Sequence, residues 1–460
     1  MHASATLRYH QTLRRFLAIS VVALSARSAQ AGQATCSNPG LPIGAGASSD
    51  LLPGRLTLSL TTGLLLLDGS EVVIENAGRI RYDSSLSLFE TRLSASYALT
   101  SSIAIGGALP YRVVDVGVEY FDPATGAPVA SASSIHIRDE RLTGFGDPSL
   151  HVHGAREVGA LRFHVRLGAT LPLGATVENP HLLGSIGQEH QHVQLGTGTV
   201  VPFGVIEAQH RFGDGARAIT GAAFAAAFLS LYENDEGYQA GHRISGGLSA
   251  SSSFGLRSLS FSIAAEVHGE RAERWDGLEY PEEGNTGRID TLVGGSIAWR
   301  PIPQLAIAFD AKVPVYSKVY GTQLAYGPVL GVGVIGTFET RNKPSYRGAD
   351  VASVGPPGSA SPLVAVPGKI TVFDLWADWC APCRELDERL ADLARRYPDR
   401  IAIRKLDVVD SDSAAWATYI APGNYDMPHV KVHGRDGALL FERSAPPLEL
   451  VRAIEALLAN

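Results

Sequence analysis

Apolar and polar residues alternate with a period of two through most of the chain, and this pattern limits the possible folds more than any other feature. In residues 258–263, for example, Leu259, Phe261 and Ile263 alternate with serines. A period of two predicts strands with one apolar face. About twelve such segments begin near residues 55, 86, 102, 146, 160, 192, 216, 241, 258, 288, 304 and 327. We therefore predict an all-β domain over residues 54–340.

The connections between these segments alternate between short and long. Tight turns such as Thr100-Ser101 and Gly255-Leu256 separate longer polar stretches, which are predicted loops at 68–84, 113–144, 173–191, 232–240, 270–287 and 318–326. This asymmetry, with an even strand count, is typical of bacterial outer-membrane barrels, whose closed sheet leaves no backbone group unpaired in lipid. We therefore predict an antiparallel transmembrane β-barrel of about twelve strands, surrounded by outer-membrane lipid.

A secreted β-sandwich or a soluble barrel is the alternative, because alternating strands also form those folds. The placement of charge favours the membrane barrel. The faces that carry Leu and Phe are almost free of charge, whereas the opposite, lumen-facing register carries Arg162, Arg166, Glu266 and Lys312.

Two stretches resemble a known family. "SYALTSSIAIGGALPYR" followed by "GFGDPSLHVHGA" is similar to the channel-like outer-membrane proteins found beside aromatic-degradation pathways. The detailed likeness covers residues 86–172, and the rest of the barrel is similar by pattern only. The resemblance implies an outer-membrane barrel with a channel-like architecture.

The N-terminus has the features of an export signal. Arg14 and Arg15 precede an apolar run, and Ala29-Gln30-Ala31 offers a signal-peptidase site, so residues 1–31 are predicted to be a signal peptide and 32–53 an N-terminal segment. Cys36 is an alternative lipid attachment site. The formal net charge of −7 gives no electrostatic footprint for nucleic acid.

Residues 341–369 are rich in Pro and Gly and are predicted to be a linker. The first and last barrel strands begin or end on the short-turn side, so both ends of the barrel are expected in the periplasm. The C-terminal domain is then expected in the periplasm, tethered near the barrel mouth.

The last part of the chain has a different pattern. Residues 370–460 are predicted to form a compact α/β domain, which could begin near 363. The predicted order is strand, helix, strand, helix, two strands and helix, over 370–376, 382–396, 401–408, 413–419, 429–433, 439–443 and 448–458.

This domain resembles the thioredoxin family. The likeness is carried by Asp374, Trp376, Trp379, Cys380, Ala381, Pro382 and Cys383 in "DLWADWCAPC", by Lys405 and Asp407 in "RKLDV", and by Met427 and Pro428 in "DMPHVKV". It covers roughly residues 363–460 and departs from the family pattern at Ala381, at the family's first helix and before the last helix.

The position of the cysteines predicts their roles. Cys380 begins a helix, where unpaired amides and the helix dipole lower its pKa, so it is the expected nucleophile, and Cys383 resolves the mixed disulfide. The resemblance implies that Asp374 assists proton transfer from Cys383 and that Pro428 is cis. It also implies a substrate-binding face, which we assign to Trp379, Pro382, Met427 and Pro428.

Other readings of the same residues are weaker. The cysteines could be half of a zinc site, but the chain has no second pair. A bridge over two residues would stabilise little as a structural disulfide. Histidines at 151, 153, 164, 190 and 192 and Glu189 could bind a metal, although scattered histidines usually do not, so no metal site is predicted.

Two function classes compete. The first is a periplasm-facing thiol–disulfide oxidoreductase, favoured in the reducing direction, that a barrel anchors to the outer membrane. The second is an outer-membrane channel or uptake barrel with an accessory redox domain. A lumen filled by the 113–144 loop would favour the anchor. Periplasmic protein thiols or disulfides and an unidentified electron donor are the expected partners, and no cofactor is expected.

Overall fold

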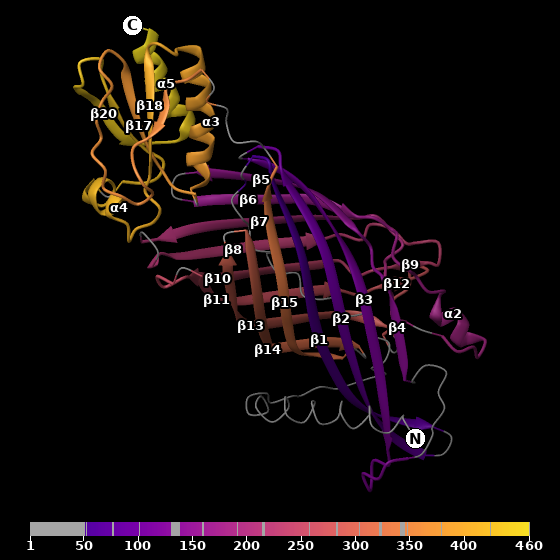
Figure 1. The fold of residues 1–460 in the computed structure, drawn as a ribbon. Coiled ribbons are helices and arrows are strands. Elements are labelled where there is room, and N and C mark those ends of the chain that lie inside the picture. The colour runs from indigo at the N-terminus through magenta and orange to yellow at the C-terminus, as the bar shows by residue number, and fades with distance from the viewer. Residues whose placement is uncertain are drawn as a thin grey trace, which may run out of the picture.

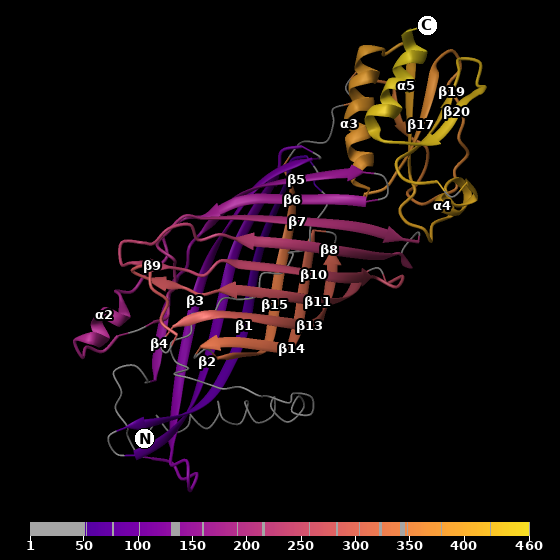
Figure 2. The same cartoon turned by 180° about the vertical axis from the view of Figure 1, so that it is seen from behind.

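The computed structural model describes residue 51 and residues 53–459, apart from gaps at 76–77, 101, 130–138, 159–160, 191, 214–216, 257, 282–283, 303, 322–323, 341–345, 347, 379 and 424. It contains a β-barrel and a C-terminal α/β domain (Figures 1 and 2). The predicted signal peptide, Cys36 and most of the segment at 32–53 lie outside the described residues.

The barrel is one antiparallel sheet. Its strands are β1 (Arg55–Glu75), β2 (Gly78–Ala98), β3 (Ile103–Phe121), β4 (Glu140–Phe145), β5 (Ser149–Val158), β6 (Leu161–Thr170), β7 (Val201–Phe212), β8 (Ile219–Phe228), β10 (Arg243–Ser252), β11 (Leu259–Arg271), β13 (Asn285–Ile302), β14 (Leu305–Gly321) and β15 (Ala325–Glu339).

The sheet closes on itself because β1 pairs with both β2 and β15 and β2 pairs with β3. β3 pairs with β4 along one half and with β5 along the other, so β4 and β5 act as one interrupted strand. Counted in this way, the described residues form a closed barrel of twelve strands, which confirms the predicted fold class.

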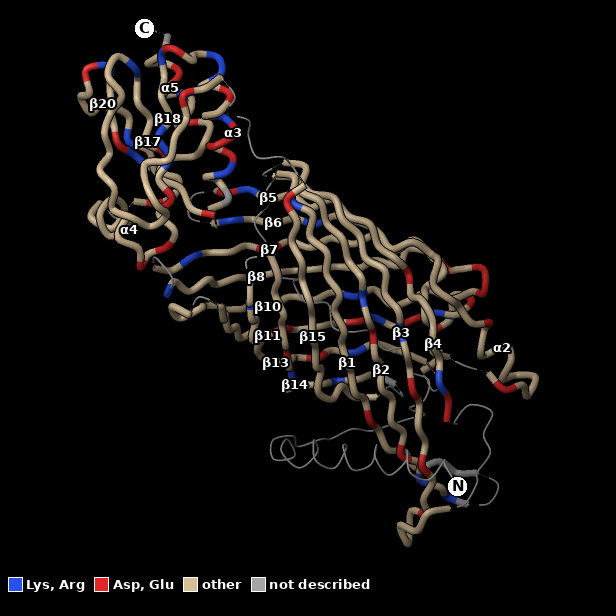
Figure 3. Tube along the Cα trace, in the orientation of Figure 1, with Lys and Arg blue, Asp and Glu red and all other residues tan. Residues whose placement is uncertain are grey.

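The exterior of the barrel is apolar. Large side chains exposed on it come from strands all around the sheet and include Leu60, Leu93, Ile105, Leu150, Leu167, Leu248, Ile263, Phe309 and Val334. Figure 3 shows that Lys, Arg, Asp and Glu are sparse on these strands and dense on the C-terminal domain. The strands therefore carry the predicted apolar face on the outside of the barrel.

The interior carries the charge. Lys312 Nζ on β14 lies 2.8 Å from Glu266 Oε1 on β11, although β13 lies between these two strands, so the side chains meet inside the barrel. Arg112 Nε on β3 similarly lies 2.8 Å from Glu90 Oε2 on β2. The lumen-facing register predicted for Glu266 and Lys312 therefore matches the structure.

A loop fills one side of the lumen. Residues 192–199, part of a segment predicted to be a strand from 192, precede β7 and pack inward. Val193 and Leu195 are buried against lumen-facing apolar side chains of β1, β2, β3, β13 and β15. Arg112 Nη1 donates to the Leu195 carbonyl oxygen at 2.9 Å. A lumen filled by the 113–144 loop was the observation that would favour the anchor, and the loop found inside the barrel is instead 192–199.

Two predicted loops are largely strand. β1 and β2 continue through 68–84, and β3 continues to Phe121 with β4 from Glu140. The ribbon of β1, β2 and β3 extends beyond the rest of the barrel (Figure 1). In β3 the alternation continues there, as in Val114 and Val116 on either side of Asp115, but the charged residues of this extension make its sequence resemble a polar loop. Connections therefore do not alternate strictly, since only two residues separate β1 from β2.

Smaller elements lie at the end of the barrel that is away from the C-terminal domain (Figure 1). They are α2 (Pro180–Ser185) and the two-stranded sheet of β9 (Tyr238–Gln239) and β12 (Arg274–Trp275). Among the described residues, no helix is both long and apolar enough to cross a membrane.

The C-terminal domain has its own sheet, in the order β16-β18-β17-β19-β20. Its elements are β16 (Val351–Ser353), β17 (Ile370–Trp376), α3 (Ala381–Arg396), β18 (Ile401–Asp407), α4 (Ala414–Tyr419), η3 (Ala421–Gly423), β19 (His429–His433), β20 (Leu439–Ser444) and α5 (Pro447–Ala459). Leu386, Leu390 and Leu393 of α3 pack with Ile454 and Leu458 of α5 over one face of the sheet.

Part of the predicted linker belongs to this domain. β16 pairs in parallel with β18, and Ala349 and Val351 pack against the core under α3. Val354 and Leu363 pack on the other face of the sheet. The prediction of a linker over all of 341–369 is therefore wrong from Tyr346 onward. The Pro and Gly residues of this segment favour an extended backbone, not a helix, along the surface of the domain.

Candidate active site

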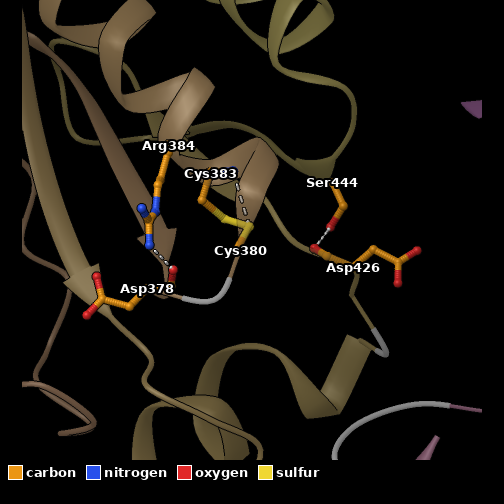
Figure 4. Close-up of a disulfide and its surroundings, with 6 residues drawn as sticks. All are labelled: Asp378, Cys380, Cys383, Arg384, Asp426 and Ser444. Atoms are coloured by element: carbon orange, nitrogen blue, oxygen red, sulfur yellow. Dashed lines mark hydrogen bonds between the residues drawn. A yellow bond between two sulfur atoms is a disulfide. The ribbon is translucent and has the colours of Figure 1, made fainter. Parts of the chain in front are cut away.

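The two cysteines lie where β17 passes into α3. Cys380 is the N-cap of α3, and Cys383 is one turn inside it. The sulfur atoms form a disulfide, with the Cα atoms 5.3 Å apart (Figure 4). The Cys383 backbone N–H donates to Cys380 Sγ at 3.1 Å. This contact uses one of the helix amides that have no partner within the helix.

Local sequence explains this placement. β17 is buried along nearly its whole length, so it runs through the middle of the domain. The Cys380 N–H donates to the Ala377 carbonyl oxygen at 3.0 Å, which turns the chain into the helix. Pro382 lies in the first helical turn, where its missing N–H costs nothing. Both cysteines are buried, with 3% and 1% exposure.

Asp374 lies beneath this helix. On β17 it is paired in register with Lys405 of β18 and Val430 of β19. Because side chains alternate along a strand, it shares a face with Val372, which packs against α3. Its carboxyl group is fully buried, and neither oxygen has a hydrogen-bond partner among the described residues. Burial raises the pKa of Asp374 to about 7, against the opposing attraction of Lys405.

The predicted substrate face includes Met427 and Pro428. The Met427–Pro428 peptide bond is cis, as the family resemblance implied. Met427 packs against the buried cluster that contains both cysteines. The neighbouring Asp426 carbonyl oxygen accepts from Ser444 Oγ at 2.6 Å (Figure 4), which ties this loop to β20. Trp379 lies outside the described residues.

Sequence reasoning missed Arg384. This residue follows Cys383, and its Nη2 donates to the Asp378 carbonyl oxygen at 2.6 Å (Figure 4). Its Nη1 lies 2.7 Å from Glu339 Oε1 at the end of the last barrel strand. The active-site helix is therefore joined to the short-turn end of the barrel. A charged residue next to a cysteine motif was the only signal available in the sequence.

Two polar residues near Asp374 were also missed, namely Asp387 on α3 and Tyr346 before β16. Asp387 Oδ1 accepts hydrogen bonds from Lys405 Nζ and from the Tyr346 hydroxyl. Tyr346 stood in the predicted linker, and nothing in its sequence neighbourhood linked it to the redox motif.

The candidate histidines form two separate groups. His153 Nε2 and His164 Nδ1 lie 3.1 Å apart on β5 and β6. His190 and His192 lie near His181, far from the cysteines in the loops at the opposite end of the barrel. In the described part of the chain, no group of three or more His, Cys, Asp or Glu side chains is arranged to hold a metal.

Comparison with known proteins identifies the C-terminal domain. Residues 362–431 match the family model for thioredoxin. The chain is 36% identical over 50 residues to Thioredoxin-T of Drosophila melanogaster, covering 11% of this chain and 32% of that protein. It is 29% identical over 122 residues to the thiol:disulfide interchange protein CycY of Rhizobium leguminosarum bv. viciae, covering 22% and 66%. The chain spans less than half the length of the first curated relatives that it matches.

An outer membrane channel from Pseudomonas putida F1 is among the similar solved structures. It has 12% sequence identity and a TM-score of 0.43, and the match covers 65% of this chain and all of that one. The predicted thioredoxin resemblance is confirmed for the C-terminal domain by the family model.

Proposed function

We propose that this chain, whose C-terminal residues form a thioredoxin domain, is a thiol–disulfide oxidoreductase anchored to the outer membrane with its redox domain in the periplasm. The observation that carries the proposal is the Cys380–Cys383 pair at the start of α3, on a complete five-stranded sheet joined to a barrel with an apolar exterior.

Cys380 is the attacking sulfur in this proposal. Its position at the N-cap, with the Cys383 N–H directed at its sulfur, favours the thiolate over the thiol. The thiolate attacks a client disulfide and forms a mixed disulfide, and one client sulfur leaves as a thiolate.

Cys383 completes the exchange. Its thiol gives its proton to the Asp374 carboxylate, and the resulting thiolate attacks Cys380 Sγ. The bond between Cys380 and the client breaks, and the client's second sulfur leaves as a thiolate. The client disulfide gains two electrons, and the Cys380–Cys383 pair loses two. All electrons stay on sulfur, so this reaction needs no cofactor.

The substrate face in this proposal consists of Trp379, Pro382, Met427 and Pro428. Met427 packs against the buried cluster that contains both cysteines, and this contact supports the assignment. A client strand laid there would present its disulfide to the helix N-terminus.

The exterior of the barrel supports the membrane location. Side chains such as Leu93, Leu167 and Ile263 are more than half exposed, and a soluble monomer rarely shows so large an apolar surface. Lipid would cover this surface, and the closed sheet satisfies the backbone. The barrel ends at Gly54 and Thr340 lie together on the short-turn side, which is periplasmic in such barrels.

A reducing role fits the buried carboxyl Asp374, which can take up the proton of Cys383. The proposed clients are periplasmic proteins with disulfides, and a separate thiol donor must return the pair to the dithiol state. The alternative, a channel with an accessory redox domain, is less favoured because Val193 and Leu195 of the inward loop fill one side of the lumen.

Trapping of clients tests the proposal. Cys383→Ser should accumulate mixed disulfides with client proteins, because the first attack proceeds and the second cannot. Cys380→Ser is the matched control and should accumulate none, because the remaining thiol lies inside the helix. Non-reducing gels of the full-length protein from cells would show the difference. Equal trapping by both variants would contradict the assigned roles.

A further inference from the structure

Three side chains from separate segments meet near Asp374, on which two of them act electrostatically. Lys405 Nζ on β18 donates to Asp387 Oδ1 on α3 and to the hydroxyl oxygen of Tyr346, the latter at 3.2 Å. The Tyr346 hydroxyl donates in turn to Asp387 Oδ1. Tyr346 belongs to the segment that leads from the barrel into the first strand of the domain.

This cluster is sheltered from solvent. The side chains of Lys405 and Asp387 are 13% and 19% exposed. The Lys405 ammonium group lies 4.7 Å from the centre of the Trp376 ring and 5.6 Å from that of the Tyr346 ring. Burial and the Asp387 carboxylate raise the pKa of Tyr346 far above its usual value, so its hydroxyl stays a donor. An ion pair this enclosed is screened less than a surface pair.

The cluster lies on the same side of the sheet as the resolving cysteine. Cys383 and Asp387 are four residues apart on α3, so they lie on one face of the helix. Asp374 is paired in register with Lys405 on the adjacent strand. The charged groups that act on Asp374 are Lys405 from β18 and Asp387 from α3, while β19 presents Val430. Asp374 itself has no hydrogen-bond partner among the described residues.

We propose that Tyr346 and Asp387 are positioning residues of the redox site, which hold the Lys405 ammonium group so that it does not form an ion pair with Asp374. This inference rests on the proposed function, because it concerns the step in which Asp374 receives the proton of Cys383. Without Asp387, the ammonium group loses its carboxylate partner, and Asp374 becomes the nearest alternative.

The consequence is a change in the pH dependence of one step. An ion pair with Lys405 favours the ionised form of Asp374 and makes it a weaker base. In Asp387→Asn, the pH midpoint of the resolving step should move down by about one pH unit. Tyr346→Phe keeps the ring and the ion pair but loses one donor, so the shift should have the same direction and be smaller. In Asp387→Asn combined with Lys405→Met, the downward shift should disappear.

The experiment uses the full-length protein in detergent, reduced and then mixed with an aromatic disulfide whose thiolate product is coloured. Attack by Cys380 releases the first equivalent, and resolution by Cys383 releases the second, so the two steps appear as two phases. Asp392→Asn, on the exposed side of α3, is the matched control and should leave both phases unchanged. Asp374→Asn should slow the second phase by about 10²-fold.

Each result decides between the alternatives. A downward shift of the second midpoint in Asp387→Asn and Tyr346→Phe, with the first phase unchanged, supports the positioning role. An unchanged midpoint in both variants, or an equal shift in Asp392→Asn, overturns it. If wild-type protein releases no second equivalent, the proposed redox function itself fails, and this outcome is distinct from an unchanged midpoint.

Discussion

The barrel and the thioredoxin domain bury opposite kinds of side chain within one chain. The domain buries leucines of α3 and α5 against its sheet, and all of its described Asp, Glu, Lys and Arg side chains except that of Asp374 are at least partly exposed. The barrel exposes leucines on its exterior and encloses ion pairs such as Glu266–Lys312. Each arrangement is stable only in its own solvent, which is water for the domain and lipid for the barrel wall. The contrast is expected of a transmembrane barrel joined to a domain that folds in water.

Asp374 is a carboxyl group buried inside the domain. Its burial gives the largest effect on stability that we expect. Below about pH 4, its carboxyl group is protonated in both the folded and the unfolded state. Between there and about pH 7 the unfolded chain releases the proton and the folded domain keeps it, because the folded pKa is raised to about 7. Stability is therefore lost as pH rises through this window, by up to about 4 kcal/mol.

Asp374→Asn should remove this loss. The variant should gain stability over wild type as pH rises from 4 to 7 and keep that gain above pH 7. Urea unfolding of the full-length protein in detergent, followed by the helical circular dichroism signal, measures the difference. Asp399→Asn, at an exposed carboxyl, should show no such trend. A gain that does not depend on pH would contradict burial of an uncharged Asp374.

A second test places a lysine on the outer or on the inner face of the barrel wall. Leu93 and Ser94 are neighbours on β2, and Leu93 is 54% exposed on the exterior while Ser94 faces the lumen. Leu93→Lys should destabilise the barrel in lipid by about 2–4 kcal/mol, because it places a charge in the hydrocarbon. Ser94→Lys should cost much less. The folded fraction is measured after refolding into lipid vesicles, from the change in gel mobility on heating. Equal destabilisation by the two variants would contradict a lipid-facing exterior.

The smallest effect is expected at the junction of the two units. Arg384 and Glu339 are exposed by 32% and 44%, so their ion pair is well solvated. Glu339→Gln should change the stability of the thioredoxin domain by less than about 1 kcal/mol, and salt should abolish the change. Glu455→Gln, which breaks the Arg396–Glu455 pair within the domain, is the control of matched exposure. A loss of several kcal/mol that persists at high salt would show a tighter junction.

The sequence predicted the barrel and the thioredoxin motif well because both depend on local pattern. The alternation in residues such as Leu259–Ile263 marks the strand directly, and the cysteine motif begins the helix where it was expected. The strand count was correct for the same reason.

The errors come from contacts that are distant in sequence. Val193 and Leu195 continue an alternating pattern, but they pack against five barrel strands as a loop inside the lumen. β16 has only three residues, and it is held by β18, about fifty residues later. The contacts of Tyr346 with Asp387 and Lys405 also join residues that are far apart in the sequence. The periodicity of a short stretch of sequence carries no information about contacts between residues that are far apart in the chain.

The central claim is that the barrel spans the outer membrane and holds the redox domain on the periplasmic side. Site-specific protease sequences inserted after Thr125, in the turn beyond β3, and after Gly213, in the turn beyond β7, test it on intact cells. The account predicts cleavage at Thr125 only, with the thioredoxin domain intact until the outer membrane is permeabilised. Cleavage at Gly213, or loss of the domain from intact cells, would contradict the account.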